Sequence, residues 1–382
     1  MPKSRAGTGA CPYGFNCDVD LCAGARFSRP VWLGGMPPPL RRFKSMLLKK
    51  SKYNVAIAGA TGAVGVEFLK VLEKRNFPIG ELRLLASSRS VGKKMNFRGK
   101  NYPVSELKEN SFESIDIALF SAGGDQSKKF ASHAVAAGAV VIDNSSAYRM
   151  DPKVPLVVPE VNPEDIAKHQ GIIANPNCTT IIALMAIYPI YKLSRIKRMV
   201  IATYQAVSGA GAKAIAELKN QTQDDLEGKK INPSVFKHAI AFNLFSHDSA
   251  IGAEGYSQEE MKVVNETKKI LHDDHMLISP TAVRVPVVRA HSEAIHLELE
   301  KELSVEEVTE ALKAMPGVKV VDDRKANIFP MPRAVTSQDD IFVGRIRKDL
   351  GLKNGINLFV CGDQILKGAA LNAIQIAEKL IA

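Results

Sequence analysis

Residues 54–74 read NVAIAGATGAVGVEFLKVLEK and decide the fold of this chain. The stretch predicts an apolar strand, a glycine-rich turn and a helix with one apolar face. Gly59, Gly62 and Gly65 lie in the turn, where backbone amides and the positive end of the helix bind a pyrophosphate. A purely structural turn is the alternative, but the flanking strand and helix favour dinucleotide binding.

The end of the next apolar run, LRLLAS at 82–87, indicates which dinucleotide binds. Enzymes that use NAD normally place an acid there to hold the ribose hydroxyls. Here the sequence is SSRS at 87–90, so the guanidinium of Arg89 and nearby hydroxyls suit a 2′-phosphate. The pattern predicts NADP. An ordinary solvated surface charge is the alternative for Arg89.

The spacing of the remaining apolar runs predicts two domains. Runs ending in SAGG near Ser121 and in DNSS near Asp143 alternate with helical segments, which is typical of a parallel sheet covered on both faces. Beyond Asn175 the runs alternate, as in the valines at 283, 285 and 287 and in HLELE at 296–300, which predicts an antiparallel sheet. We therefore expect an α/β fold, with a Rossmann-type domain at 52–175 completed by a C-terminal helix at 355–382, and an α+β domain at 176–354 with a mixed, largely antiparallel sheet.

The positive charge is concentrated at the N-terminus. The chain has 382 residues and a formal net charge of +11, of which residues 1–52 contribute +8. The nearly neutral remainder argues against a nucleic-acid partner. No apolar stretch is long enough to span a membrane, so we expect a soluble protein. Residues 1–51 are a basic leader, expected to be disordered. It resembles a transit segment, which would indicate a plastid, or it is an extension upstream of Met46, which would indicate the cytoplasm.

Cys178 is the candidate nucleophile. It lies in NPNCTTIIALMAIYPI, where a proline ends any earlier helix and an apolar helix begins just after the cysteine. A sulfur in the first turn of a helix is expected to ionise more easily, because the helix dipole and free amides favour the thiolate. An inert buried thiol is the alternative, and Cys361 fits that description. The spacing of Cys11, Cys17 and Cys22 predicts no disulfide framework or zinc site.

Two residues could assist this thiol. His291 follows VRVPVVRA in a loop expected after a strand, and it could act as general base. Arg284, seven residues earlier, could hold a substrate carboxylate through two hydrogen bonds. A capped surface histidine and an ordinary ion pair are the alternatives. The HDDH at His272 fits a solvated helix end better than a metal site, so no metal is expected.

Seven motifs together carry a family resemblance. GATGAVG, SAGG, NPNCTT, TYQAVSGAG, EEMK, RVPVVRAHSE and GDQILKGAA occur in the order typical of aspartate-semialdehyde dehydrogenases, and the resemblance covers about all of 52–382. It implies a homodimer built through the second, catalytic and dimerisation domain. It also implies the reductive dephosphorylation of L-aspartyl 4-phosphate to L-aspartate 4-semialdehyde, a step toward lysine (through diaminopimelate), threonine and methionine.

The resemblance assigns roles to particular positions. Cys178 would form the acyl thioester, His291 would accept and donate the proton, and Gln205 would orient the substrate. Arg284 would hold the α-carboxylate and Glu259 the amino group, while Lys262, Arg149 and Asn177 would bind phosphate. NADP would be lined by Gly59, Thr61, Gly62, Ala63, Val64, Arg89, Ser90, Ser121, Ala122, Gly123, Ser208, Gly209 and Gln364.

Three other functions compete with this reading. N-acetyl-γ-glutamyl-phosphate reductase shares the chemistry, but an acetylated amine would not need Glu259. A glyceraldehyde-phosphate dehydrogenase is less favoured, because its cofactor site usually carries the acid for NAD. A non-catalytic NADP-binding sensor or scaffold would be expected to lack Cys178 or His291, and both are present.

Overall fold

The first sheet lies in the N-terminal part of the chain. The computed structural model describes Leu47 and residues 49–382, so the predicted leader falls outside the described residues apart from its last few positions. The first sheet has the order β3-β4-β2-β1-β5-β6-β7, and every pair is parallel except β3 with β4. Its strands are β1 (Tyr53–Ala58), β2 (Ile79–Ala86), β3 (Lys94–Phe97), β4 (Lys100–Glu106), β5 (Ile117–Phe120), β6 (Val140–Asp143) and β7 (Ile172–Ala174).

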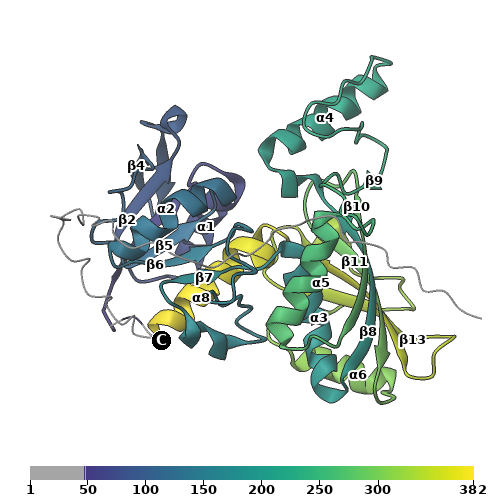
Figure 1. Cartoon of the computed structure of the whole chain (residues 1–382). Helices are drawn as coiled ribbons and strands as arrows, with labels where there is room; N and C mark the ends of the chain where they lie inside the picture. Colours follow the sequence, from purple (N-terminus) through teal and green to yellow (C-terminus); the bar gives the residue numbers. More distant parts are fainter. Residues whose placement is uncertain (1–46, 48) are drawn as a thin grey trace, which may run out of the picture. The chain divides into compact units, whose positions relative to one another are not determined.

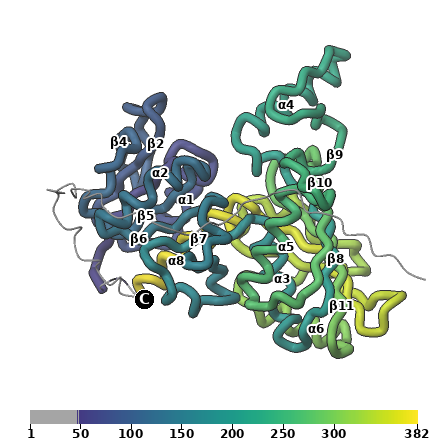
Figure 2. Tube along the Cα trace, in the orientation of Figure 1, coloured from purple at the N-terminus to yellow at the C-terminus, as the bar shows by residue number. Residues whose placement is uncertain are grey.

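Helices cover both faces of this sheet, as the apolar strands require. On one face, α1 (Ala63–Lys74) and α8 (Leu371–Ile381) share a buried apolar cluster with the strands. On the other face, α2 (Gly124–Ala136) contributes Phe130 and two alanines to a second cluster. In Figure 2 the C-terminal helix α8, coloured yellow, lies beside β7 of this domain. The C-terminal segment thus returns to the first domain, where α8 contacts α1 and β6.

The second sheet is mixed. Its order is β12-β13-β14-β11-β8-β10-β9, with parallel pairs β8–β10 and β12–β13 and antiparallel pairs elsewhere. Its strands are β8 (Ile196–Gln205), β9 (Phe245–Ser246), β10 (Leu277–Arg284), β11 (His291–Leu299), β12 (Val318–Val320), β13 (Ile341–Lys348) and β14 (Gly355–Gly362). The predicted fold class, a Rossmann-type domain plus a domain with a mixed, largely antiparallel sheet, is confirmed.

Three helices cover one face of the second sheet (Figure 1). They are α3 (Cys178–Leu193), α5 (Gln258–Leu271) and α6 (Val305–Ala314), and they share the largest apolar cluster with β8, β11 and β14. Nearly all of α3 is buried, which explains why its sequence is continuously apolar rather than striped. Helix α4 (Ala212–Leu226) and the short α7 (Pro332–Val335) lie elsewhere in this domain. Short turns of 3-10 helix are η1 (Ser88–Ser90), η2 (Pro163–Lys168) and η3 (Val207–Ala210).

Two secondary-structure predictions are corrected. The predicted C-terminal helix at 355–382 is wrong in its first part, because Gly355–Gly362 pairs with β11 and β13 as strand β14. A single π-helical turn, η4 (Leu366–Ala370), then precedes α8. The alternating valines after 283 also do not continue as a strand, since β10 ends at Arg284. Among the described residues, no helix is long and apolar enough to cross a membrane.

Candidate active site

Cys178 is the first residue of α3, as predicted. The preceding Asn177 is the N-cap, and its side-chain oxygen accepts hydrogen bonds from the amides of Thr179 and Thr180, at 3.0 and 3.4 Å. The turn η4 closes on the other side: a Cβ added to Gly368 would lie 2.9 Å from the Cβ of Cys178. The candidate nucleophile Cys178 is therefore held between the start of α3 and a close backbone approach that requires glycine.

His291 is brought to the sulfur from the second sheet. Its Nε2 lies 3.5 Å from Cys178 Sγ, and its Nδ1 accepts a hydrogen bond from the Ala206 amide at 3.0 Å. His291 begins strand β11 and is 1 % exposed, so it is neither in a loop nor a surface histidine. Because Nδ1 is an acceptor, the neutral ring carries its proton on Nε2 and presents it to the sulfur. This geometry favours the donor half of the predicted role, since accepting a proton would require a change of tautomer.

The prediction that the start of helix α3 makes the Cys178 sulfur a thiolate is wrong, because burial has the largest effect on its pKa. Burial raises the pKa of Cys178 to about 11, and the Glu259 carboxylate adds to this, while Arg149 and Thr179 only partly oppose it. Burial and the Arg284 guanidinium lower the pKa of His291 to about 3. Both shifts favour a neutral thiol beside a neutral imidazole, because burial disfavours the charged form of each group.

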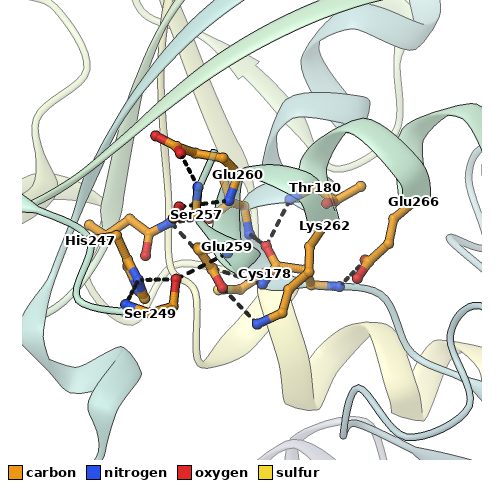
Figure 3. A network of polar contacts seen from close by, with 12 residues as sticks. Cys178, Thr180, His247, Ser249, Ser257, Glu259, Glu260, Lys262 and Glu266 are labelled. Carbon is orange, nitrogen blue, oxygen red and sulfur yellow. Dashed lines mark hydrogen bonds and ion pairs between the residues drawn. The ribbon is translucent and has the colours of Figure 1, made fainter. Parts of the chain in front are cut away.

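The first turns of α5 supply an acid and a cation beside the thiol (Figure 3). Glu259 accepts hydrogen bonds from Lys262 Nζ at 2.8 Å and Asn177 Nδ2 at 2.9 Å. Gln205, at the end of β8, donates to Thr179 Oγ1 at 2.9 Å and to Glu259 at 3.4 Å. Burial opposes ionisation of Glu259, but Lys262 and its other partners outweigh it and hold its pKa at about 2. This buried carboxylate stays charged and can meet a cation.

Arg149 lies in the same cleft, and three of its N–H donors already have partners within the protein. Its guanidinium donates to the Asn175 carbonyl, the Asn144 carbonyl and Glu266, at 3.0, 2.8 and 3.1 Å. Glu266 also accepts the Asn177 amide at 2.6 Å. A guanidinium has five N–H donors, so two remain for a ligand. Lys262 likewise keeps two of its three donors.

Arg284 is buried at the end of β10. Nη1 donates to the Ala206 carbonyl at 3.0 Å, Nη2 contacts His247 Nε2 at 2.7 Å, and Nε has no hydrogen-bond partner among the described residues. A buried guanidinium with an unused donor suits an incoming carboxylate. Gly209 packs over it, because a Cβ there would lie 3.5 Å from Nη1 and 3.6 Å from His291 Cε1.

The glycine turn has the close packing that a dinucleotide site needs. Gly59 has φ +90°, and a Cβ there would lie 2.3 Å from the Ser121 carbonyl oxygen. A Cβ on Gly65 would lie 2.3 Å from the Gly59 carbonyl oxygen. Helix α1 begins at Ala63 after Gly62, with no side chain capping its amides. Those free amides, next to a backbone that admits no side chain, fit a pyrophosphate.

The predicted cofactor residues are only partly gathered in one cleft. Arg89 is exposed in η1 and lies apart from the cysteine, while Ser90 Oγ is 3.3 Å from Thr61 Oγ1. Gly123, with φ +92°, precedes α2 next to Ala122. A cleft of about 520 Å³ joins the nucleophile to both domains. Of the predicted residues it is lined by Val64, Ser121, Arg149, Asn177, Cys178, Gln205, Ser208, Gly209, Glu259, Lys262, Arg284, His291 and Gln364.

Several cleft residues were not predicted from the sequence. His247 and Asp248 lie beside Arg284, and Ser249 Oγ accepts the Glu259 amide at 3.1 Å. Asn144 and Ser146 follow β6 and line the opposite wall. The polar HDS at 247–249 after a short apolar run was the available signal, but nothing in its spacing links it to Arg284.

A Rossmann-type domain that meets a half-buried cysteine beside a buried histidine is the arrangement of a dehydrogenase. Family models match on both sides of the cleft: "Semialdehyde dehydrogenase, NAD binding domain" over residues 54–169 and "Semialdehyde dehydrogenase, dimerisation domain" over 187–367. The aspartate-semialdehyde dehydrogenase of Synechocystis sp. is 55 % identical over 87 % of this chain and 98 % of its own. This chain belongs to the aspartate-semialdehyde dehydrogenase family.

Solved structures agree with this assignment. Aspartate semialdehyde dehydrogenase II from Vibrio cholerae, complexed with ASA, is 46 % identical, with a TM-score of 0.85 over 87 % of this chain and 99 % of that chain. The Candida albicans enzyme with NADP is 26 % identical, with a TM-score of 0.68 over 86 % of this chain and 98 % of that chain.

Proposed function

We propose that this protein catalyses the NADP-dependent reductive dephosphorylation of L-aspartyl 4-phosphate to L-aspartate 4-semialdehyde, on the route to lysine, threonine and methionine. The observation that carries the proposal is the 3.5 Å approach of His291 Nε2 to Cys178 Sγ, in a cleft lined by residues of the glycine-turn domain. Family membership and the relative with bound ASA support this substrate.

Three charged groups of the substrate, its α-carboxylate, its ammonium and its phosphate, each bind to charged residues of the cleft. The α-carboxylate meets Arg284, whose Nε is unused, and the ammonium meets the ionised Glu259. The phosphate meets the spare donors of Lys262 and Arg149, with the Asn177 amide group as a further contact. These placements are assigned from the charge and free donors of each group.

Binding of the substrate prepares the nucleophile. Glu259 is one reason why the pKa of Cys178 is raised, so an ammonium paired with Glu259 removes that repulsion. The phosphate-binding cations also favour a thiolate. His291 Nε2–H then donates to the sulfur anion and, once the sulfur attacks, to the oxygen that gains negative charge.

The bonds change in a fixed order. The Cys178 thiol gives up its proton and its sulfur attacks the acyl carbon; a C–S bond forms and the C–O bond to phosphate breaks, and the leaving phosphate takes up the proton while the cations hold its remaining negative charge. When bound, reduced NADP would supply the hydride that reduces the thioester carbon to the aldehyde level. His291 Nε2–H stabilises the oxygen while the C–S bond then breaks, and the departing semialdehyde leaves a thiolate that regains a proton from solvent. Gln205, anchored on Thr179, keeps the substrate near the sulfur.

A substrate comparison tests the proposal. Purified protein with NADP and phosphate is expected to oxidise L-aspartate 4-semialdehyde at least about 10³-fold more efficiently than N-acetyl-L-glutamate 5-semialdehyde, because an acetylated amine has no positive charge to meet the buried, ionised Glu259. The measurement is kcat/KM for each aldehyde, followed by NADPH absorbance. Equal efficiencies, or a preference for the acetylated substrate, would favour N-acetyl-γ-glutamyl-phosphate reductase.

Arg89 is proposed as the residue that selects NADP. Arg89→Asp is expected to lower the ratio of kcat/KM with NADP to that with NAD by roughly 10²-fold, because it replaces a phosphate-binding cation by a repelling carboxylate. Lys94→Asp is the matched control, since Lys94 is exposed in β3 and the charge change is identical. An unchanged cofactor ratio in Arg89→Asp would contradict this role.

We also propose a homodimer formed through the second domain. The family model for 187–367 is a dimerisation domain, and the sheet face away from α3 exposes Val200 and Tyr204 at 37 % each. Sedimentation velocity is the direct check.

The cytoplasm is the proposed compartment, because both described cysteines are free and the chemistry needs a reduced thiol. The plastid alternative depends on the leader. We propose no nucleic-acid partner.

A further inference from the structure

Arg289 connects three separate parts of the fold. It lies in the segment between β10 and β11, two residues before His291, and does not line the cleft. Its Nε donates to Asp363 Oδ2 at 2.7 Å, and its Nη2 donates to Glu67 Oε1 at 3.2 Å. Glu67 belongs to α1, the helix that follows the glycine turn, so Arg289 bridges the first domain and the strand that carries His291.

Asp363 organises the turn that closes over the nucleophile. It is fully buried and, besides Arg289, it accepts the amides of Ser337, Ile365 and Leu366, at 2.7, 3.0 and 3.3 Å. The last two amides begin η4, the π-helical turn whose Gly368 packs on Cys178. The same carboxylate therefore fixes both Arg289 and the wall behind the sulfur.

The residue between Arg289 and His291 is held in an uncommon backbone conformation. Ala290 has φ +74° and is fully buried. A residue with a Cβ adopts this conformation only where its surroundings enforce it. The Ala290 amide donates to Gln364 Oε1 at 2.8 Å, and the Arg289 carbonyl accepts from Thr336 Oγ1 at 3.4 Å. Without the Arg289 ion pairs, this turn would lose its strongest charged anchor.

We infer that Arg289 is a positioning residue for the catalytic pair. Its ion pairs with Glu67 and Asp363 hold the strained turn at Ala290, and the turn sets the distance from His291 Nε2 to Cys178 Sγ. Because Glu67 lies on α1, the same ion pairs keep the imidazole in register with the glycine turn. The inference deepens the proposed dehydrogenase function, and it predicts an effect on catalysis without an equal effect on binding.

Arg289→Met tests this role, because methionine keeps the length of the side chain and removes its charge. We expect kcat to fall on the order of 10²-fold, since small displacements of a catalytic group have effects of this size. The KM for NADP should change by less than about threefold. The matched control is Arg75→Met, which removes a two-bond ion pair between α1 and Glu378 far from His291, and should retain activity within about threefold.

A second readout needs no substrate and no cofactor. The rate of Cys178 alkylation by iodoacetamide is measured from pH 6 to 10, in a background in which the other four cysteines, Cys11, Cys17, Cys22 and Cys361, are replaced by alanine. We expect Arg289→Met to alkylate about tenfold more slowly at pH 7.5, because the thiolate loses the Nε2–H hydrogen bond. This readout tests the positioning role of Arg289 separately from the proposed function. The alkylation rate should change with Arg289 even if the protein turns over a different substrate.

The outcomes are distinct. A loss of kcat with retained NADP affinity and a slower alkylation supports the inference, and partial recovery in Arg289→Lys, which can reach one carboxylate, supports it further. Unchanged alkylation, or equal losses in kcat and NADP affinity, overturns it. If Arg289→Met does not fold, Glu67→Gln is used, which removes one of the two carboxylate partners, and the same signature is expected at a smaller size, about tenfold in kcat and about threefold in alkylation rate. Wild-type alkylation in Glu67→Gln would then overturn the inference.

Discussion

Cys178→Ala is expected to lower kcat for aspartate semialdehyde oxidation by about 10⁴-fold or more. In the proposed mechanism the sulfur forms the covalent bond to the acyl carbon, and it lies 3.5 Å from His291 Nε2 in the cleft. The glycine turn and the free amides of α1 are untouched by the change. The NADP dissociation constant, measured by fluorescence titration, should therefore stay within about threefold of the wild-type value.

Cys361→Ala is the matched control for this experiment. Cys361 is buried in β14, where its sulfur lies 3.1 Å from Ser292 Oγ, and burial raises its pKa to about 12. The same deletion of a thiol should leave kcat within a few-fold. Substantial turnover by Cys178→Ala, or an equal loss in both variants, would exclude a thioester on Cys178.

Arg284→Leu should raise the KM for aspartate semialdehyde by roughly 10²-fold, the effect of removing one partner of a buried charged pair. The guanidinium is 4 % exposed, with Nε unpaired among the described residues, so a bound carboxylate has no equivalent partner once it is gone. The KM for NADP should change little, because Arg284 contacts Ala206 and His247 rather than the glycine turn.

The control for this prediction is Arg333→Leu, which removes an exposed arginine in α7. It should leave both Michaelis constants near their wild-type values. Steady-state kinetics, with each substrate varied in turn, gives the KM for aspartate semialdehyde and the KM for NADP in both variants. If Arg284→Leu raised the two Michaelis constants equally, Arg284 would have a structural role rather than hold the carboxylate.

For Cys178, the sequence predicts the start of the helix but not the pKa of the thiol. That α3 begins at Cys178 follows from Pro176 and the apolar run after it, because caps and helix starts are local. The raised pKa of the thiol does not follow locally. It depends on burial and on Glu259, which is 81 positions away and reaches the sulfur only when α5 packs against α3.

In the C-terminal segment, too, one part of the secondary structure follows from the local sequence and another part does not. Residues 371–381 have a helical apolar pattern and form α8. Residues 355–362 are mostly apolar, a pattern that a buried strand and a buried helix both produce. Their pairing with β11 and β13 settles the assignment, and it also places Asp363 where Arg289 can reach it.

The sequence by itself determined the glycine turn, the helix start at Cys178, the change from parallel to mixed sheet and the family, because each depends on neighbours within a few residues or on ordered motifs. Tertiary structure alone decided that the Ala206 amide sets the tautomer of His291, that the Cys178 thiol is protonated, and that Arg289 links α1 to the segment before strand β11. These depend on burial and on charges from distant segments, which act only after the sheets and helices have packed.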